Sequence, residues 1–134
     1  MKKYVHFVGV LCAALVVLSF TGISTRPTPI DDVITAVKTG NAGMLARYFD
    51  QTVEISLPDR SDAYSKSQAE QVMKDFFNSK NIKNFDVDHR TDQGRSVCCI
   101  GTLFTGSGSY RTTLYMKTRN DKQSLQEIRI EEKR

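Results

Sequence analysis

The stretch that organises the chain runs from residue 96 to residue 117 and reads SVCCIGTLFT, then GSG, then SYRTTLYMK. The two outer runs are rich in β-branched and aromatic residues, and a Gly-Ser-Gly turn at 106–108 separates them. Because glycine adopts the positive φ that a tight turn needs, the pattern predicts a β-hairpin. The first run is apolar on both faces, which is typical of a central strand. The second alternates, so Tyr110 faces the core, whereas Arg111 and Tyr115 face outward.

Amphipathic segments before the hairpin predict three helices. Thr28 and Pro29 are suited to the start of a helix that Gly40 would end. Its apolar residues recur at helical spacing: Ile30, Val33, Ile34 and Val37. A second, shorter helix follows Asn41, with apolar spacing at Met44, Leu45, Tyr48 and Phe49. A third begins at a capping box near Ser65 or Ser67 and runs to about residue 79, with Phe76 and Phe77 on its apolar face.

Alternating patterns predict the other strands. Residues 53–57 show one apolar and one polar face, and residues 58–62 have turn chemistry that stops the strand. In residues 85–90 the alternation places Phe85, Val87 and His89 on one face. The final strand includes residues 128–131. The expected order is ααβαββββ, an α+β plan in which helices pack on the concave face of a strongly curved, mainly antiparallel sheet.

The residue pattern also resembles a known family. Its motifs are Tyr64-Ser65-Lys66, Gln68-Ala69-Glu70, Phe76-Phe77, Gly101-Thr102-Leu103, Gly108, Tyr110-Arg111 and Ile128-Arg129-Ile130-Glu131. They look like those of small exported bacterial proteins with the cone-shaped nuclear transport factor 2-like (cystatin-like) fold, a family classed as a domain of unknown function. The resemblance implies a fold with a pocket inside the cone, and it carries over no catalytic residue.

The first 24 residues have the features of a signal peptide. Lys2 and Lys3 precede an apolar run from Phe7 to Phe20, and Ser24 suits a cleavage site. An uncleaved anchor is the alternative, but this run is shorter than the roughly 20 residues that span a bilayer. We therefore expect cleavage after Ser24, a single domain at residues 25–134, and a periplasmic or extracellular location.

Charge and cysteine content argue against several classes of function. The net charge of +4 is reduced when Lys2 and Lys3 are removed, and the remaining charges are interspersed, so nucleic acid is not an expected partner. Cys98 and Cys99 are neighbours on a strand and point to opposite faces, so a mutual disulfide is not expected. Asp86, Asp88 and Asp92 resemble the start of a calcium-binding loop. The fifth position of such a loop needs an oxygen ligand, and here it is Arg90, so the pattern fails. We expect neither a metal nor a cofactor.

The candidate site residues are aromatic residues and one histidine. Tyr48, Phe76, His89 and Tyr110 are predicted to line a hypothetical ligand pocket on the concave face. His89 is the weak catalytic candidate, because a neutral imidazole facing that pocket serves as an acid or a base. Arg111 and Tyr115 mark a hypothetical partner surface on the outer face, where an aromatic ring is flanked by cations.

These features favour an exported, non-enzymatic domain that binds a small apolar ligand or a protein partner in the cell envelope. One alternative is a pocket enzyme of proton-transfer or dehydratase type that uses His89. Another is a dimerisation module that associates through the outer sheet face around Tyr115, which would make the protein a homodimer.

Overall fold

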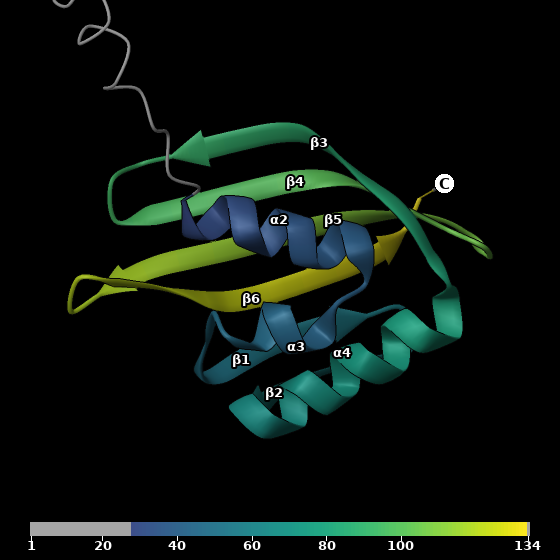
Figure 1. Cartoon of the computed structure of the whole chain (residues 1–134), viewed down its shortest axis with the longest axis horizontal. Coiled ribbons are helices and arrows are strands. Elements are labelled where there is room, and N and C mark those ends of the chain that lie inside the picture. The colour runs from purple at the N-terminus through teal and green to yellow at the C-terminus, as the bar shows by residue number, and fades with distance from the viewer. Residues whose placement is uncertain (1–27, 134) are drawn as a thin grey trace, which may run out of the picture.

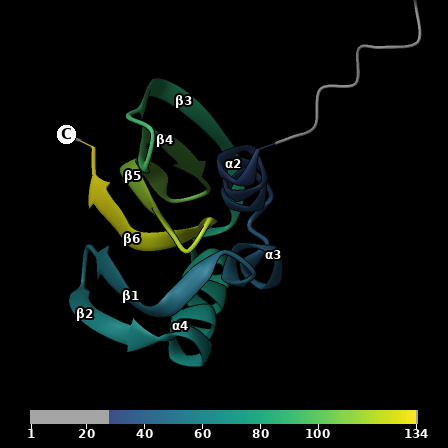
Figure 2. The same ribbon diagram turned by 90° about the vertical axis from the view of Figure 1, so that its left-hand side faces the viewer.

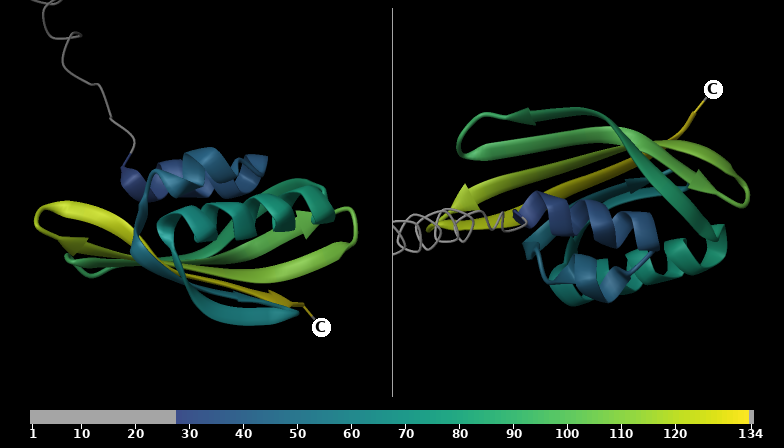
Figure 3. Two further views of the ribbon diagram at one scale, coloured as in Figure 1. Left: turned by 90° about the horizontal axis from the view of Figure 1, so that it is seen from below. Right: turned by 45° about the horizontal axis from the view of Figure 1, so that its top comes forward.

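The computed structural model describes residues 28–133 of the chain, and the predicted signal peptide lies outside them. The helices of this part are α2 (Pro29–Thr39), α3 (Ala42–Ala46) and α4 (Lys66–Lys80). The strands are β1 (Phe49–Leu57), β2 (Arg60–Ser65), β3 (Ile82–Asp92), β4 (Ser96–Thr105), β5 (Gly108–Arg119) and β6 (Lys122–Glu132). All three helices lie against one face of a six-stranded sheet (Figure 1; Figure 3), which confirms the α+β prediction. No helix among the described residues is long and apolar enough to cross a membrane.

The sheet has the strand order β2-β1-β6-β5-β4-β3. Strands β3 to β6 form the predicted antiparallel meander. Strand β1 then pairs parallel with β6 and antiparallel with β2. This places β1 and β2 beside α4, as the end-on view in Figure 2 shows.

Two predicted segments are wrong. Residues 60–62, expected in a turn, belong to β2, and only Pro58 and Asp59 separate β2 from β1. Strand β2 is an edge strand whose side chains are exposed or half-buried, so no apolar alternation indicates it. Helix α3 ends at Ala46 rather than near Phe49, because Phe49 pairs with Leu125 in the parallel β1–β6 ladder.

The predicted hairpin is confirmed, but its first strand is not the centre of the sheet. Strand β4 pairs with β5 on one side and with the edge strand β3 on the other. Its inner face is fully covered by the helical layer. On its outer face Cys98 and Ile100 are half-buried, and Phe104 is 37% exposed. The apolar outer face of β4 therefore remains a surface of the domain.

Local signals set the helix ends. At the start of α4, Ser65 Oγ accepts a hydrogen bond from the Gln68 N–H, and Gln68 Oε1 accepts one from the Ser65 N–H, which is a capping box. Asn81 ends the helix in the left-handed conformation with φ 56°. Gly40 has φ 66° and ends α2 in the same way.

The core lies between the helices and the concave face of the sheet, and side chains fill it. Its largest fully buried members are Ile30, Leu45, Ile55, Met73, Leu103, Leu114, Met116, Leu125, Ile128 and Ile130. Burying each such side chain contributes about 1.5–3 kcal/mol before the entropy cost is counted. The expected pocket inside the cone is therefore occupied by the protein's own side chains.

Gly101 on β4 allows the β3 backbone to lie unusually close to it. A Cβ atom there would lie 2.4 Å from the Asp86 carbonyl oxygen and 2.7 Å from a ring carbon of Phe85. Phe85, which is 2% exposed, thus occupies the space that a side chain at position 101 would need. Only glycine lets the β3 backbone and the Phe85 ring lie this close to β4.

We expect Gly101→Ala to lower the free energy of unfolding by about 1–3 kcal/mol, because backbone and ring must both shift. Urea unfolding followed by circular dichroism measures this. The matched control is Gly43→Ala in α3, where the nearest atom to the new Cβ is Asn41 Oδ1 at 3.6 Å. This control should be neutral or stabilising, since alanine favours helices. Equal unfolding midpoints for the two variants would contradict the packing role of Gly101.

Candidate functional site

The candidate site is a pocket of about 430 Å³ where α4, the β1–β2 turn and the end of β6 meet. We call it the mouth pocket. Leu57, Val72 and Phe76 supply its apolar part. Its charged members are Asp59, Arg60, Asp75, Lys80 and Glu132. The volume lies in the range of small-molecule sites.

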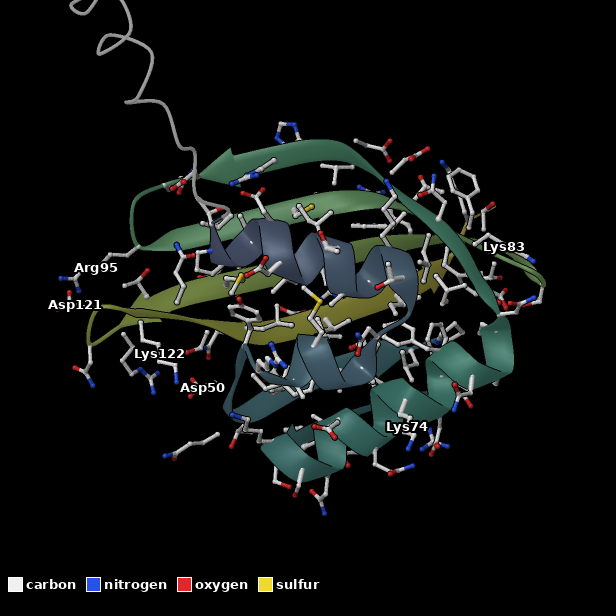
Figure 4. All side chains as sticks on the ribbon, in the orientation of Figure 1. Asp50, Lys74, Lys83, Arg95, Asp121 and Lys122 are labelled. Atoms are coloured by element: carbon white, nitrogen blue, oxygen red, sulfur yellow. The ribbon has the colours of Figure 1, made fainter. Side chains whose placement is uncertain are left out.

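One stripe of α4 forms the helical wall of the mouth pocket. Asp75 and Phe76 lie three and four residues after Val72, and Ser79 and Lys80 lie three and four residues after Phe76, so all five share one face of the helix. Lys74 lies on the same helix (Figure 4) but does not line the mouth pocket, because it faces the connection between α2 and α3. The capping box at Ser65 sets the start of this helix and therefore helps to position the stripe.

The Phe76 ring packs against a residue of the sheet, Tyr110 on β5. It is 6% exposed and meets the Tyr110 ring edge to face, with 6.1 Å between centroids and an interplanar angle of 78°. Lys80 Nζ lies 5.7 Å from the centroid of the Tyr110 ring, which is a cation–π contact. Since Phe76 and Tyr110 come from α4 and β5, their contact fixes one pocket wall against the sheet. The mouth pocket therefore presents an apolar surface to a ligand, with positively and negatively charged side chains around it.

Of the four residues predicted to line one pocket, the structure brings Phe76 and Tyr110 together. Tyr48 lies elsewhere, where its hydroxyl donates a hydrogen bond to Asp32 Oδ2 and so connects α2 to the start of β1. The Asp32 carboxylate, together with partial burial, raises the pKa of Tyr48. Tyr48 does not line the mouth pocket.

The prediction that His89 shares a face with Phe85 is wrong. Strand β3 has a bulge: Val87 pairs with Gly101, but His89 pairs with the next residue of β4, Ile100. The extra residue reverses the alternation, so His89 points to the outer face. There its Nε2 atom lies 3.1 Å from Thr91 Oγ1, in an exposed position.

The same bulge directs Arg90 toward the helices. Its guanidinium donates to Asp31 Oδ1 over 2.9 Å and so connects β3 to the first turn of α2. Asp31 also accepts hydrogen bonds from the Thr28 hydroxyl and from the Thr28 N–H, at 2.7 Å and 2.9 Å. These bonds, those from Thr28 first and that from Arg90 next, lower the pKa of Asp31.

Arg111 and Tyr115 lie on the outer face, as their alternation on β5 predicts. Arg111 is exposed and pairs across the strands with Thr102 and Glu131. Tyr115 is half-buried and pairs with Cys98 and Glu127. Whether a partner binds this surface stays a prediction.

Among the described residues, Cys98 and Cys99 are free cysteines that lie on opposite faces of β4. Burial raises the pKa of the Cys99 thiol to about 11, so this thiol is protonated at neutral pH and is a poor nucleophile. Within residues 28–133, no group of three or more histidine, cysteine, aspartate or glutamate side chains is placed to hold a metal ion.

Sequence reasoning missed most of the mouth pocket. Leu57, Ser79, Lys80 and Glu132 were not predicted to belong to a site. The spacing of Val72, Phe76 and Ser79 is a signal for one shared helix face, but nothing local indicates that β1 and β6 meet that face. Figure 4 shows the charged residues Asp50, Arg95, Asp121 and Lys122 at the opposite end of the strands. There Asp50 accepts a hydrogen bond from Gln126 Nε2 over 2.7 Å, which is the main cause of its lowered pKa.

Solved structures identify the class of fold. An NTF2-like protein of unknown function from Cytophaga hutchinsonii is 13% identical, with a TM-score of 0.58, over 83% of this chain and 95% of that one. At this level of identity the likeness shows the fold alone, which is the nuclear transport factor 2-like fold predicted from the sequence.

The particular family follows from a closer match. The model of the family described as Domain of unknown function (DUF4783) matches residues 30–131, and the chain belongs to this family. A DUF4783 family protein from Bacteroides uniformis is 28% identical, with a TM-score of 0.77, over 80% of this chain and 99% of that one. One from Bacteroides fragilis is 30% identical, with a TM-score of 0.73, over 80% and 100% of the two chains. No curated protein matches the chain.

The Asp31 contacts generate a test at acid pH. Because the folded-state pKa of Asp31 is lowered, its stabilising effect is complete above the ordinary value of 3.8 and is lost as pH falls below it. We expect Asp31→Asn to lower the melting temperature at pH 7. We also expect this variant to lose less stability than the wild-type protein when the pH falls from about 5 to about 3. Thermal melts across this pH range measure both effects.

Asp62→Asn is the matched control, since Asp62 is an exposed carboxylate of the edge strand β2 and contacts the N–H of its neighbour Ala63. Its melting curve should follow that of the wild-type protein. If Asp31→Asn retains the full acid sensitivity of the wild type, the Thr28 and Arg90 contacts do not stabilise the folded state in solution.

Proposed function

We propose that this protein is an exported, non-enzymatic binding domain that holds a small ligand in the mouth pocket. The observation that carries the proposal is a pocket of about 430 Å³ whose apolar wall, Phe76, is fixed by its edge-to-face contact with Tyr110. A ligand with an apolar body would contact Phe76, Val72 and Leu57. Its polar groups would reach the charged residues around them.

Binding has more support than the catalytic hypothesis that rests on His89. Among the described residues that line it there is no histidine or cysteine. His89, the residue of the enzyme hypothesis, lies on the other face of the sheet and contacts Thr91. General acid–base chemistry needs a group with a suitable pKa within reach of the substrate, and His89 cannot reach a ligand in this pocket.

The proposed location is the periplasm or the cell exterior, where the ligand or an envelope protein would be encountered. The support for export comes from residues 1–24, which combine two lysines, an apolar run and Ser24 at a suitable cleavage position. The alternative is a dimerisation module that associates through the outer sheet face around Tyr115, in which case a second copy of the chain would occupy this face.

We expect the exported protein to begin at Thr25 when it is produced in a bacterium with an intact secretion system. Intact-mass measurement of the periplasmic fraction checks this. Replacing Lys2 and Lys3 by glutamate should reduce export, because the positive n-region is removed. A protein that retains Met1 and sediments with the membrane would instead indicate an uncleaved anchor.

We expect Ser79→Phe to weaken ligand binding by filling the mouth pocket, because Ser79 lines it. Asn78→Phe is the matched control, since it adds the same ring to the same helix outside the mouth pocket. Ligand-observed NMR with a panel of aromatic fragments identifies a binder, and we expect Ser79→Phe to weaken it at least about tenfold. Equal binding by wild type and both variants would place the ligand elsewhere and contradict the proposal.

A further inference from the structure

A second hollow, of about 390 Å³, lies on the outer face of the sheet, where His89 and Arg111 come together. We call it the outer groove. Asp88, His89, Ile100, Thr102, Arg111 and Lys133 line it. They come from β3, β4, β5 and the residue that follows β6. None of these residues lines the mouth pocket.

A chain of hydrogen bonds crosses the groove. Lys133 Nζ donates to Thr102 Oγ1 over 3.1 Å, and Thr102 Oγ1 donates to Asp88 Oδ2 over 3.0 Å. Thr102 is 4% exposed, so its hydroxyl is a buried link between the two charged residues. The Lys133 N–H also donates to the Ser109 carbonyl over 3.1 Å, which fixes Lys133 beside the start of β5. Lys133 is therefore positioned over the groove by two separate contacts.

Positive charge exceeds negative charge in the groove. Arg111 and Lys133 are cations, and the carboxylate of Asp88 already accepts the Thr102 hydrogen bond. Within residues 28–133, Arg111 takes part in no ion pair, whereas Arg90, Arg119 and Arg129 each do. Glu131 is opposite Arg111 on β6 but does not line the groove.

We infer that the outer groove binds a small organic carboxylate with an apolar body. The planar guanidinium of Arg111 matches a carboxylate with two parallel hydrogen bonds, and Lys133 adds a second positive charge. Ile100 is half-buried and supplies an apolar contact for the rest of the ligand. An inorganic anion would leave that contact unused. This site is independent of the mouth pocket and lies on the opposite face of the sheet.

Benzoate is the probe that tests this inference, with phosphate and acetate as comparisons. Titration into the ¹⁵N-labelled full chain should shift the amide signals of Ile100, Thr102 and Arg111, and benzoate should bind more tightly than either comparison anion. We expect Arg111→Gln to weaken benzoate binding at least about tenfold. Lys133→Gln should weaken it less, because glutamine keeps a donor for Thr102 but loses the charge.

Arg129→Gln is the matched control. It removes a cation from the same outer face, but from a residue that is paired with Glu127 at 2.9 Å and does not line the groove. Benzoate affinity should be unchanged in this variant, and circular dichroism confirms that all three variants fold.

Three results would overturn the inference. The first is the absence of benzoate shifts at millimolar concentration, and the second is equal weakening by Arg111→Gln and Arg129→Gln. The third is a concentration-dependent dimer that Arg111→Gln dissociates while benzoate does not bind, because the groove would then be covered by a second copy of the chain.

Discussion

The sheet has to bury one face under three helices, and this requirement governs where the side chains of every inner strand lie. Since the backbone is pleated, each strand that turns apolar residues toward the helices turns its other residues to the outside. Leu114 and Met116 on β5 are fully buried for this reason, while Arg111 and Lys117 on the same strand are exposed. A slip of one residue in any inner strand would expose half of the core, so the register is strongly determined.

Strand β3 breaks this alternation once, and both faces of the domain depend on that break. The bulge after Val87 turns Arg90 inward, where it pairs with Asp31 and connects the edge strand to α2. It also turns His89 outward, next to Ile100, and so contributes to the outer groove. A bulge at a sheet edge also disturbs the row of free backbone groups and protects the edge from unwanted pairing. The packing of β3 on α2, the protection of the sheet edge and the chemistry of the outer face thus all depend on the β-bulge after Val87.

The two candidate sites lie where the helical layer ends or is absent. Beneath the helices the concave face is filled with apolar side chains, so a ligand finds space at the rim, where α4 passes the β1–β2 turn. On the outer face no helix among residues 28–133 covers the sheet (Figure 3), and side chains of β3, β4 and β5, together with Lys133 after β6, surround the groove directly. The exposed charged residues at either site can therefore vary without disturbing the core that holds the fold.

Local residue chemistry is sufficient for much of this protein. Capping residues, helical spacing and the Gly-Ser-Gly turn act within a few residues, so α2, α4 and the β4–β5 hairpin could be predicted, as could the outward position of Arg111 and Tyr115. Pairing between distant segments could not. Strand β2 has no buried face, so no apolar alternation predicts it. Phe49 fits a helical pattern but pairs with Leu125 in the parallel β1–β6 ladder. The pairing of β1 with β6 also brings Glu132 close to α4. His89 lies on the outer face because one extra residue in β3 reverses the alternation of side chains, and the groups that β3 contacts around this bulge, Gly101 on β4 and Asp31 on α2, are distant from it in sequence.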